Sequence, residues 1–155
     1  MGLAVEPLAK RNHGTLIYVY RPEMLEARLN DLQVAKFLRA YGYDPTSARD
    51  CMSILRRRMR MQNTHATADG QPGNFPHEIG VFLGYPLEDV IGFVENNGAN
   101  SLASGCWKVY ANVEEAIECF ARYKECARCF EERYEAGDSL ESLMSEGMFS
   151  KGAAA

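Results

Sequence analysis

The sequence predicts a helix-dominated α+β fold with six or seven helices and two short strands, at about residues 15–20 and 105–110. Apolar residues recur at helical spacing along most of the chain, which indicates amphipathic helices. Only the two strand segments are short runs rich in β-branched and aromatic residues. Because a lone strand cannot satisfy its backbone hydrogen-bonding groups, we expect these two strands to pair with each other.

The composition is that of one globular domain. Of the 155 residues, 46% are hydrophobic and 25% are charged, and this balance is typical of a folded chain with a single domain over residues 1–155. Polar residues, glycine and proline concentrate at residues 63–74, which we expect to form a long loop. We expect flexible ends at residues 1–13 and 148–155.

The charge balance and the absence of long apolar runs argue against nucleic acid and membranes as partners. The chain has 17 basic and 21 acidic residues, for a formal net charge of −4, whereas a general nucleic-acid binder needs many basic contacts to phosphate. The sequence has no signal-peptide pattern, and no apolar run approaches the ~20 residues of a membrane span. We therefore expect a cytoplasmic protein that binds a small molecule or another protein, and neither nucleic acid nor a membrane.

Three helices are expected between the first strand and the loop. Pro22 suits the first turn of a helix over residues 22–29. Asp31 offers an N-cap for a second helix, which Gly42 ends. A third helix is expected over residues 45–62, with its apolar residues at helical spacing.

Further helices are expected after the loop. Proline and glycine delimit a short helix over residues 76–84, and another helix follows directly. Asn112 is expected to cap a long helix over residues 112–136 and to form a capping box with Glu115. Asp138 is expected to cap a last short helix.

The most distinctive segment is residues 75–86, which contains two prolines, two glycines and the adjacent pair His77 and Glu78. The pair falls in the expected first turn of a helix, where backbone N–H groups are free and the positive dipole end should lower the pKa of His77. In a functional interpretation, this helix end binds a ligand, His77 donates or accepts a proton or binds a metal, and Glu78 assists it. In a structural interpretation, Glu78 complements the dipole and His77 makes a local cap bond.

Gly80 is not explained as a helix boundary. A glycine inside a helix costs about 1 kcal/mol relative to alanine, so we expect another helix or a ligand to approach closely there. The predicted ligand-binding residues are therefore His77, Glu78, Gly80 and Tyr85, and His77 and Glu78 are also the candidate catalytic residues. The sequence identifies no cofactor.

The five cysteines are odd in number, which indicates free thiols or ligands rather than a disulfide framework. Cys126 and Cys129 form a C-x-x-C motif within the long helix, away from the helix N-terminus that activates redox pairs of this kind. They are candidate metal ligands, although zinc needs four ligands and the chain has no second C-x-x-C motif.

The chain reads Phe-Pro-His-Glu-Ile-Gly-Val-Phe-Leu-Gly-Tyr-Pro-Leu-Glu-Asp-Val-Ile-Gly-Phe-Val-Glu at residues 75–95 and Trp-Lys-Val-Tyr at residues 107–110. These motifs resemble those of an uncharacterised bacterial family, catalogued only as a domain of unknown function (family 3793). The resemblance is close over the C-terminal half, through the cysteine-bearing helix, and looser over residues 15–43. After Trp-Lys-Val-Tyr the chain has Ala111-Asn112 where the family has Gly-Asp. The resemblance implies no reaction, cofactor or catalytic residue.

Three hypotheses for function follow from these observations. The leading one is a small ligand-binding or accessory protein with its site near the N-terminus of the helix that His77 opens. The second is an enzyme that uses His77 as a general acid or base. The third is a thiol or metal-binding redox protein that acts through Cys126 and Cys129.

Overall fold

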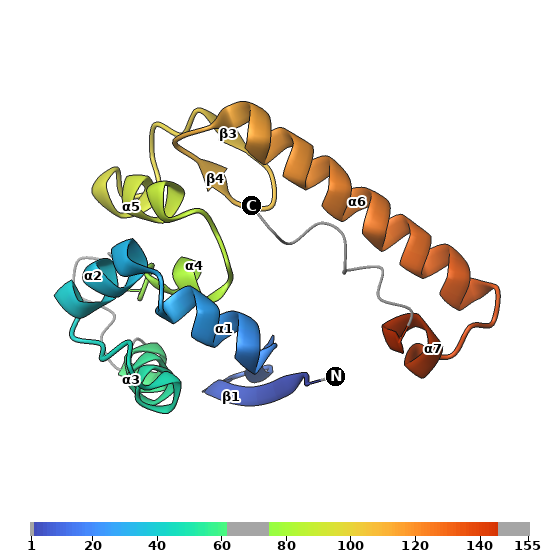
Figure 1. Cartoon of the computed structure of the whole chain (residues 1–155), viewed down its shortest axis with the longest axis horizontal. Coiled ribbons are helices and arrows are strands. Elements are labelled where there is room, and N and C mark those ends of the chain that lie inside the picture. Colours follow the sequence, from blue (N-terminus) through green and yellow to red (C-terminus); the bar gives the residue numbers. More distant parts are fainter. Residues whose placement is uncertain (1, 62–74, 146–155) are drawn as a thin grey trace. The chain divides into compact units, whose positions relative to one another are not determined.

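The computed structural model of the chain describes residues 2–61 and 75–145. Within these residues the chain forms seven helices and two antiparallel strand pairs (Figure 1), which confirms the helix-dominated α+β class. The predicted loop at residues 63–74 and the predicted flexible end at residues 148–155 lie outside the described residues. None of the described helices is long and apolar enough to cross a membrane.

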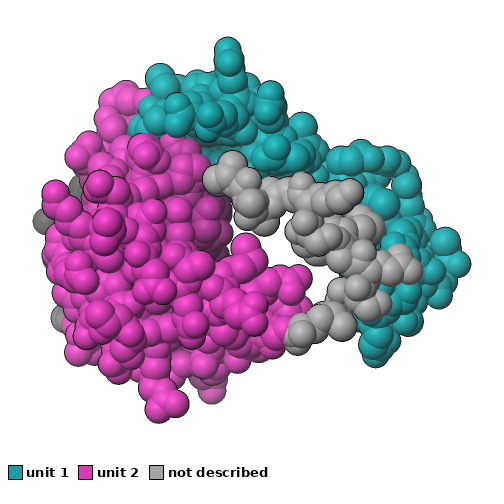
Figure 2. All heavy atoms as spheres, viewed as in Figure 1, with its two compact units in different colours: residues 1, 101–155 teal, residues 2–100 magenta. Residues whose placement is uncertain are grey.

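The chain divides into two compact units (Figure 2). We call residues 2–100 the first unit because they come first in the sequence (magenta, unit 2 in the key of Figure 2). Residues 101–155 together with residue 1 are the second unit (teal, unit 1 in that key). The prediction that residues 1–155 form one domain stays a prediction.

The first unit begins with a β-hairpin, of which the sequence predicts only the second strand. β1 (Ala4–Arg11) pairs in antiparallel with β2 (Gly14–Tyr20), so the expectation that residues 1–13 are loose is wrong. A β-bulge between Pro7 and Ala9 interrupts β1, and the successive residues Leu8 and Ala9 are both buried. A bulge breaks the alternation of buried and exposed residues by which a strand is found in a sequence.

The predicted pairing of the two strand segments is also wrong. β2 pairs only with β1 among the described residues, and in the second unit β3 (Ala103–Ser104) pairs with β4 (Lys108–Val109). Each strand thus satisfies its backbone groups with its neighbour in sequence. A local hairpin closes a far shorter loop than a pairing across most of the chain, and therefore loses less conformational entropy.

Helices α1 (Pro22–Leu29), α2 (Leu32–Ala40) and α3 (Ala48–Met61) confirm the three helices expected after the first strand. The carboxylate of Asp31 caps α2 and accepts hydrogen bonds from the backbone N–H groups of the second and third helical residues at 2.9 and 3.0 Å. Helix α3 begins later than predicted. The carboxylate of Asp44 accepts from the N–H and the hydroxyl of Thr46 at 3.1 and 2.7 Å and fixes a turn before the helix.

Helices α4 (Ile79–Phe82) and α5 (Leu87–Glu95) complete the first unit. Only residues 79–82 of the predicted helix over residues 76–84 are helical, and His77 and Glu78 lie in a turn that precedes α4. Gly84 ends the segment with a left-handed φ of +81°, as its position predicts. The core of this unit draws on the hairpin and on all five helices, and includes Leu8, Tyr18, Leu25, Leu29, Leu38, Leu55, Met59, Phe82 and Val90.

The second unit consists of the hairpin of β3 and β4 followed by the long helix α6 (Val113–Glu135) and the short helix α7 (Leu140–Ser145). Its described core is small. Val109, Ala116 and Phe120 are buried together, and the edge of Trp107 meets the ring of Phe120 at a centroid distance of 4.5 Å.

Both predicted caps in the second unit are wrong. Asn112 has a left-handed φ of +48°, and its side chain makes no cap hydrogen bond, so it forms no capping box with Glu115. At α7, the hydroxyl of Ser139 accepts a hydrogen bond from the N–H of Ser142 at 3.2 Å. The expected cap, Asp138, instead accepts a hydrogen bond from Nε of Arg133 at 2.6 Å.

Candidate functional site

Glu78 is a buried carboxylate at the centre of a polar cluster in the first unit. Its side chain is only 2% exposed. Its Oε1 accepts a hydrogen bond from the hydroxyl of Tyr43 at 2.9 Å and lies 3.0 Å from Nε of Arg58. The same guanidinium donates to the backbone carbonyl of Tyr41 at 2.7 Å and lies over the Tyr41 and Tyr43 rings, 5.6 and 5.7 Å from their centroids. The cluster thus links α3 to the end of α2 and to the turn before α4.

The electrostatics of this cluster keep Tyr43 protonated. Burial raises the pKa of Tyr43 well above its ordinary range, and the negative charge of Glu78 and the hydrogen bond to it add to this effect, while Arg58 opposes it. Burial and the charge of Glu78 also raise the pKa of Tyr41. The Tyr43 hydroxyl therefore remains a hydrogen-bond donor. Its hydrogen bond and the ion pair with Arg58 together compensate for the cost of burying the Glu78 carboxylate.

His77 lies at the surface, in different surroundings from Glu78. The imidazole is exposed and lies beside two aromatic rings, with centroid distances of 5.2 Å to Phe75 and 4.9 Å to Phe93. Partial burial lowers the pKa of His77, and the charge of Glu78 partly offsets this effect. The sequence correctly predicts that the pKa of His77 is lowered. The main cause is desolvation of the imidazole, whereas the sequence predicts an effect of the helix dipole.

Gly80 is a close-packed position. A Cβ atom at Gly80 would lie 2.8 Å from Cγ2 of Val90 and 3.2 Å from the ring of Tyr85. The approach of α5 therefore accounts for this glycine. Close packing of another helix is one of the two explanations that the sequence predicts, the other being a ligand. The backbone carbonyl of Tyr85 accepts a hydrogen bond from the guanidinium of Arg28. The structure thus brings Gly80 and Tyr85 together in packing, while Glu78 is engaged in the core and His77 lies at the surface.

A cavity of about 360 Å³ opens between the hairpin, α1 and α3. Its polar lining residues are Glu6, Tyr20, Glu26, Arg49, Ser53 and Arg56. Its apolar lining residues are Pro22, Leu25, Ala48 and Met52. The five residues that α3 contributes lie at positions 48, 49, 52, 53 and 56, which share one face of the helix.

The charges around this cavity are of both signs. Glu6 and Arg56 form an ion pair. Burial and the negative charge of Glu6 raise the pKa of Tyr20, while Arg56 lowers it. Glu26 on α1 and Arg49 on α3 are exposed, and neither belongs to an ion pair within the described part of the chain.

The sequence does not predict this cavity. The residue that β1 contributes to its wall is Glu6, and the sequence predicts a loose end rather than a strand there. The helical spacing of Arg49 and Arg56 was the available signal, since it predicts two guanidinium groups on one face of α3. The sequence cannot show which acidic residue pairs with Arg56.

The cysteines are all free thiols. Cys126 and Cys129 are half-buried on α6. Cys51 is buried in the first unit, and burial raises the pKa of its thiol to about 11. Within residues 2–61 and 75–145, no group of three or more His, Cys, Asp and Glu side chains is placed to hold a metal ion.

A family model with the description "Protein of unknown function (DUF3793)" matches residues 1–144. The chain belongs to this family. The match confirms the resemblance drawn from residues 75–95 and 107–110 and extends it over the N-terminal half. No curated protein and no solved structure matches the chain.

Proposed function

We propose that the protein binds a small zwitterionic molecule, such as an amino acid or a dipeptide, in the cavity between the hairpin, α1 and α3. The observation that carries this proposal is a cavity of about 360 Å³ with side chains of both charges in its wall. Small-molecule sites typically begin at about 300 Å³ and combine an apolar wall with a few polar groups. The apolar residues from α1 and α3 and the polar residues around them fit this description.

The charges of the wall suggest the chemistry of the ligand. The ion pair between Glu6 and Arg56 neutralises one charge of each sign. Glu26 and Arg49 then present one carboxylate and one guanidinium, on two different helices. A carboxylate on the ligand would pair with Arg49, whose guanidinium suits bidentate recognition, and an ammonium group would pair with Glu26.

The binding role agrees with the leading hypothesis from the sequence, but we place the ligand elsewhere. Glu78 already bonds to Tyr43 and Arg58, and Gly80 is packed against Val90. The carboxylate of Glu78 is thus not placed to orient His77, so no observation favours an enzyme that acts through this pair. Nor does any observation favour metal or thiol chemistry at Cys126 and Cys129.

Thermal unfolding in the presence of single amino acids and dipeptides tests the proposal. A ligand that binds only the folded chain stabilises it, by about 2.7 kcal/mol at a hundred times its dissociation constant. We expect a zwitterionic member of the panel to raise the melting temperature. The variants Arg49→Gln and Glu26→Gln should each lose most of this increase, because each removes one charge from the cavity wall.

Arg57→Gln is the matched control, because Arg57 is exposed on α3 and does not line the cavity. This variant should keep the full increase in melting temperature. The proposal fails if no zwitterion in the panel stabilises the protein. It fails equally if the stabilisation survives in both cavity variants.

A further inference from the structure

Helix α6 carries a continuous heptad pattern of apolar residues. Seven positions follow the alternating spacing of three and four residues that defines the a and d positions of a coiled coil, namely Val113, Ala116, Phe120, Tyr123, Ala127, Phe130 and Tyr134. Such a pattern places all seven side chains along one seam of the helix.

The second unit covers only the first part of this seam. Ala116 and Phe120 are buried with Val109, and the rings of Trp107 and Tyr123 meet edge to face with a centroid distance of 6.4 Å. Beyond this point Phe130 is half-buried, whereas Tyr123 and Tyr134 are 54% and 56% exposed and Ala127 is exposed as well. Residues 123–134 therefore form an apolar surface, which we call the α6 seam.

We propose that the α6 seam pairs in antiparallel with the same seam of a second copy of this chain. In an antiparallel pair each a residue faces a d residue of the partner helix. The register that centres the seam places Ala127 opposite the partner's Phe130 and Tyr123 opposite the partner's Tyr134. Small residues thus face large ones in the central layers, which is the alternation that fills space between helices.

Charge complementarity supports the second copy as the occupant. Lys124 and Glu131 occupy the e positions that flank the seam. In the same antiparallel register Lys124 faces the partner's Glu131, and the two-fold symmetry repeats this pair on the other side. Within the described residues neither side chain forms an ion pair. A parallel arrangement would instead place Cys119 and Cys126 opposite these charges and would form no such pair.

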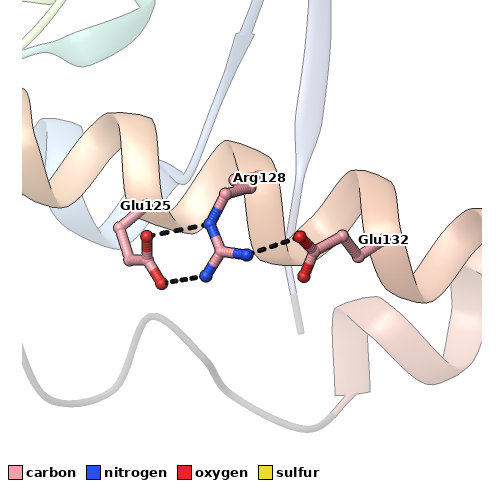
Figure 3. A network of polar contacts seen from close by, with 3 residues as sticks. All are labelled: Glu125, Arg128 and Glu132. Atoms are coloured by element: carbon pink, nitrogen blue, oxygen red, sulfur yellow. Dashed lines mark hydrogen bonds and ion pairs between the residues drawn. The ribbon is translucent and has the colours of Figure 1, made fainter.

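The face of α6 that points away from the seam is suited to solvent. Arg128 bridges Glu125 and Glu132 along the helix (Figure 3), with distances of 3.1 and 2.6 Å to the two oxygens of Glu125. These residues occupy b and f positions, which lie on the outside of a two-helix pair. Their hydrogen bonds therefore support the helix without competing for the seam.

Measuring the molar mass of the full chain over a range of concentrations, by sedimentation equilibrium, tests the proposal. Residues 123–134 rise about 18 Å along the helix axis, so the contact is short and we expect a reversible dimer. The apparent mass should increase from that of one chain toward that of two. Lys124→Glu and Glu131→Lys should each weaken dimerisation at least tenfold, because each creates two like-charged pairs across the interface.

The double variant Lys124→Glu, Glu131→Lys restores both opposite-charge pairs in the antiparallel register and should recover the affinity. Arg122→Glu is the control: it reverses an exposed charge at a c position of α6 and should leave the affinity unchanged. Circular dichroism establishes that each variant remains folded. A chain that stays monomeric at every concentration overturns the proposal, and so does a double variant that associates no better than the single ones.

Discussion

At the level of single residues, the cluster around Glu78 shows how the first unit keeps a carboxylate in its core. Taking a charge out of water costs several kcal/mol unless hydrogen bonds and an opposite charge replace the water. Tyr43 supplies a hydrogen bond and Arg58 supplies the charge, at 2.9 and 3.0 Å. Because Arg58 also holds the carbonyl of Tyr41, the loss of Glu78 affects the contact between α2 and α3.

We predict that Glu78→Ala lowers the free energy of unfolding by about 3 kcal/mol, because it leaves Arg58 without its buried partner. Tyr43→Phe should cost about 2 kcal/mol, because it removes a hydrogen bond to a buried charged group. Urea denaturation measures both changes. Glu95→Ala is the control: this exposed carboxylate lies at the C-terminal end of α5, where the helix dipole disfavours it, so its removal should cost nothing. A Glu78→Ala variant as stable as this control would contradict the structural role.

Gly80 provides a second prediction, which concerns shape rather than charge. Gly80→Ala should destabilise the protein by about 1–3 kcal/mol, because the added methyl group would lie 2.8 Å from Cγ2 of Val90, whose β-branched side chain is stiff. Val90→Ala should remove this clash. We therefore expect the double variant to be more stable than the sum of the two single effects implies, by at least about 1 kcal/mol. If Gly80→Ala alone stabilises the chain, the observed packing at α5 is wrong.

At the level of elements, helices are easier to predict than strands, because a few neighbouring residues determine where a helix begins and ends. Pro22 and Asp31 act on their immediate neighbours, and the helices that they begin are present as predicted. Strand β1 has no such signal, because its bulge places Leu8 and Ala9 together in the core. The pairing of strands was beyond sequence reasoning, since it depends on which backbone is nearest in space.

The candidate site shows the same limit. The sequence marked His77, Glu78 and Gly80 as unusual, but their partners lie elsewhere in the chain. Arg58 comes from a run of three arginines, and nothing in the run indicates which one reaches Glu78. The contact between Gly80 and Val90 requires the turn between α4 and α5. Unusual residues can thus be found from sequence, whereas the reason for them requires the fold.

Substitutions at Asn112, at the start of α6, distinguish an N-cap residue from a residue that adopts a left-handed backbone conformation. Its left-handed backbone and missing cap bond predict that Asn112→Gly is at least as stable as the native chain, because glycine has no Cβ to strain this conformation. Asn112→Ser should be less stable by about 1 kcal/mol, although serine is as good an N-cap as asparagine. Thermal unfolding compares the two variants. The opposite order, with serine more stable than glycine, would indicate the capping box that the sequence predicts.

At the level of the whole molecule, the two compact units differ in the size of their cores. The first unit buries side chains from a hairpin and five helices. Among the described residues, the second buries Val109, Ala116 and Phe120 together, and Leu143 on α7. The free energy of local unfolding differs between parts of a chain that bury different amounts of apolar surface. The smaller core should therefore unfold first.

Trp107 makes this expectation measurable, because it is the only tryptophan of the chain and lies in the smaller core. We predict that its fluorescence reports unfolding at lower urea than hydrogen exchange of the amides in α3, measured at one protein concentration. Val109→Ala should shift only the fluorescence midpoint. Leu55→Ala should weaken the protection of α3 by about 2–5 kcal/mol, because it opens a cavity in the larger core. Coincident midpoints that move together in both variants would instead establish one cooperative domain over residues 1–155.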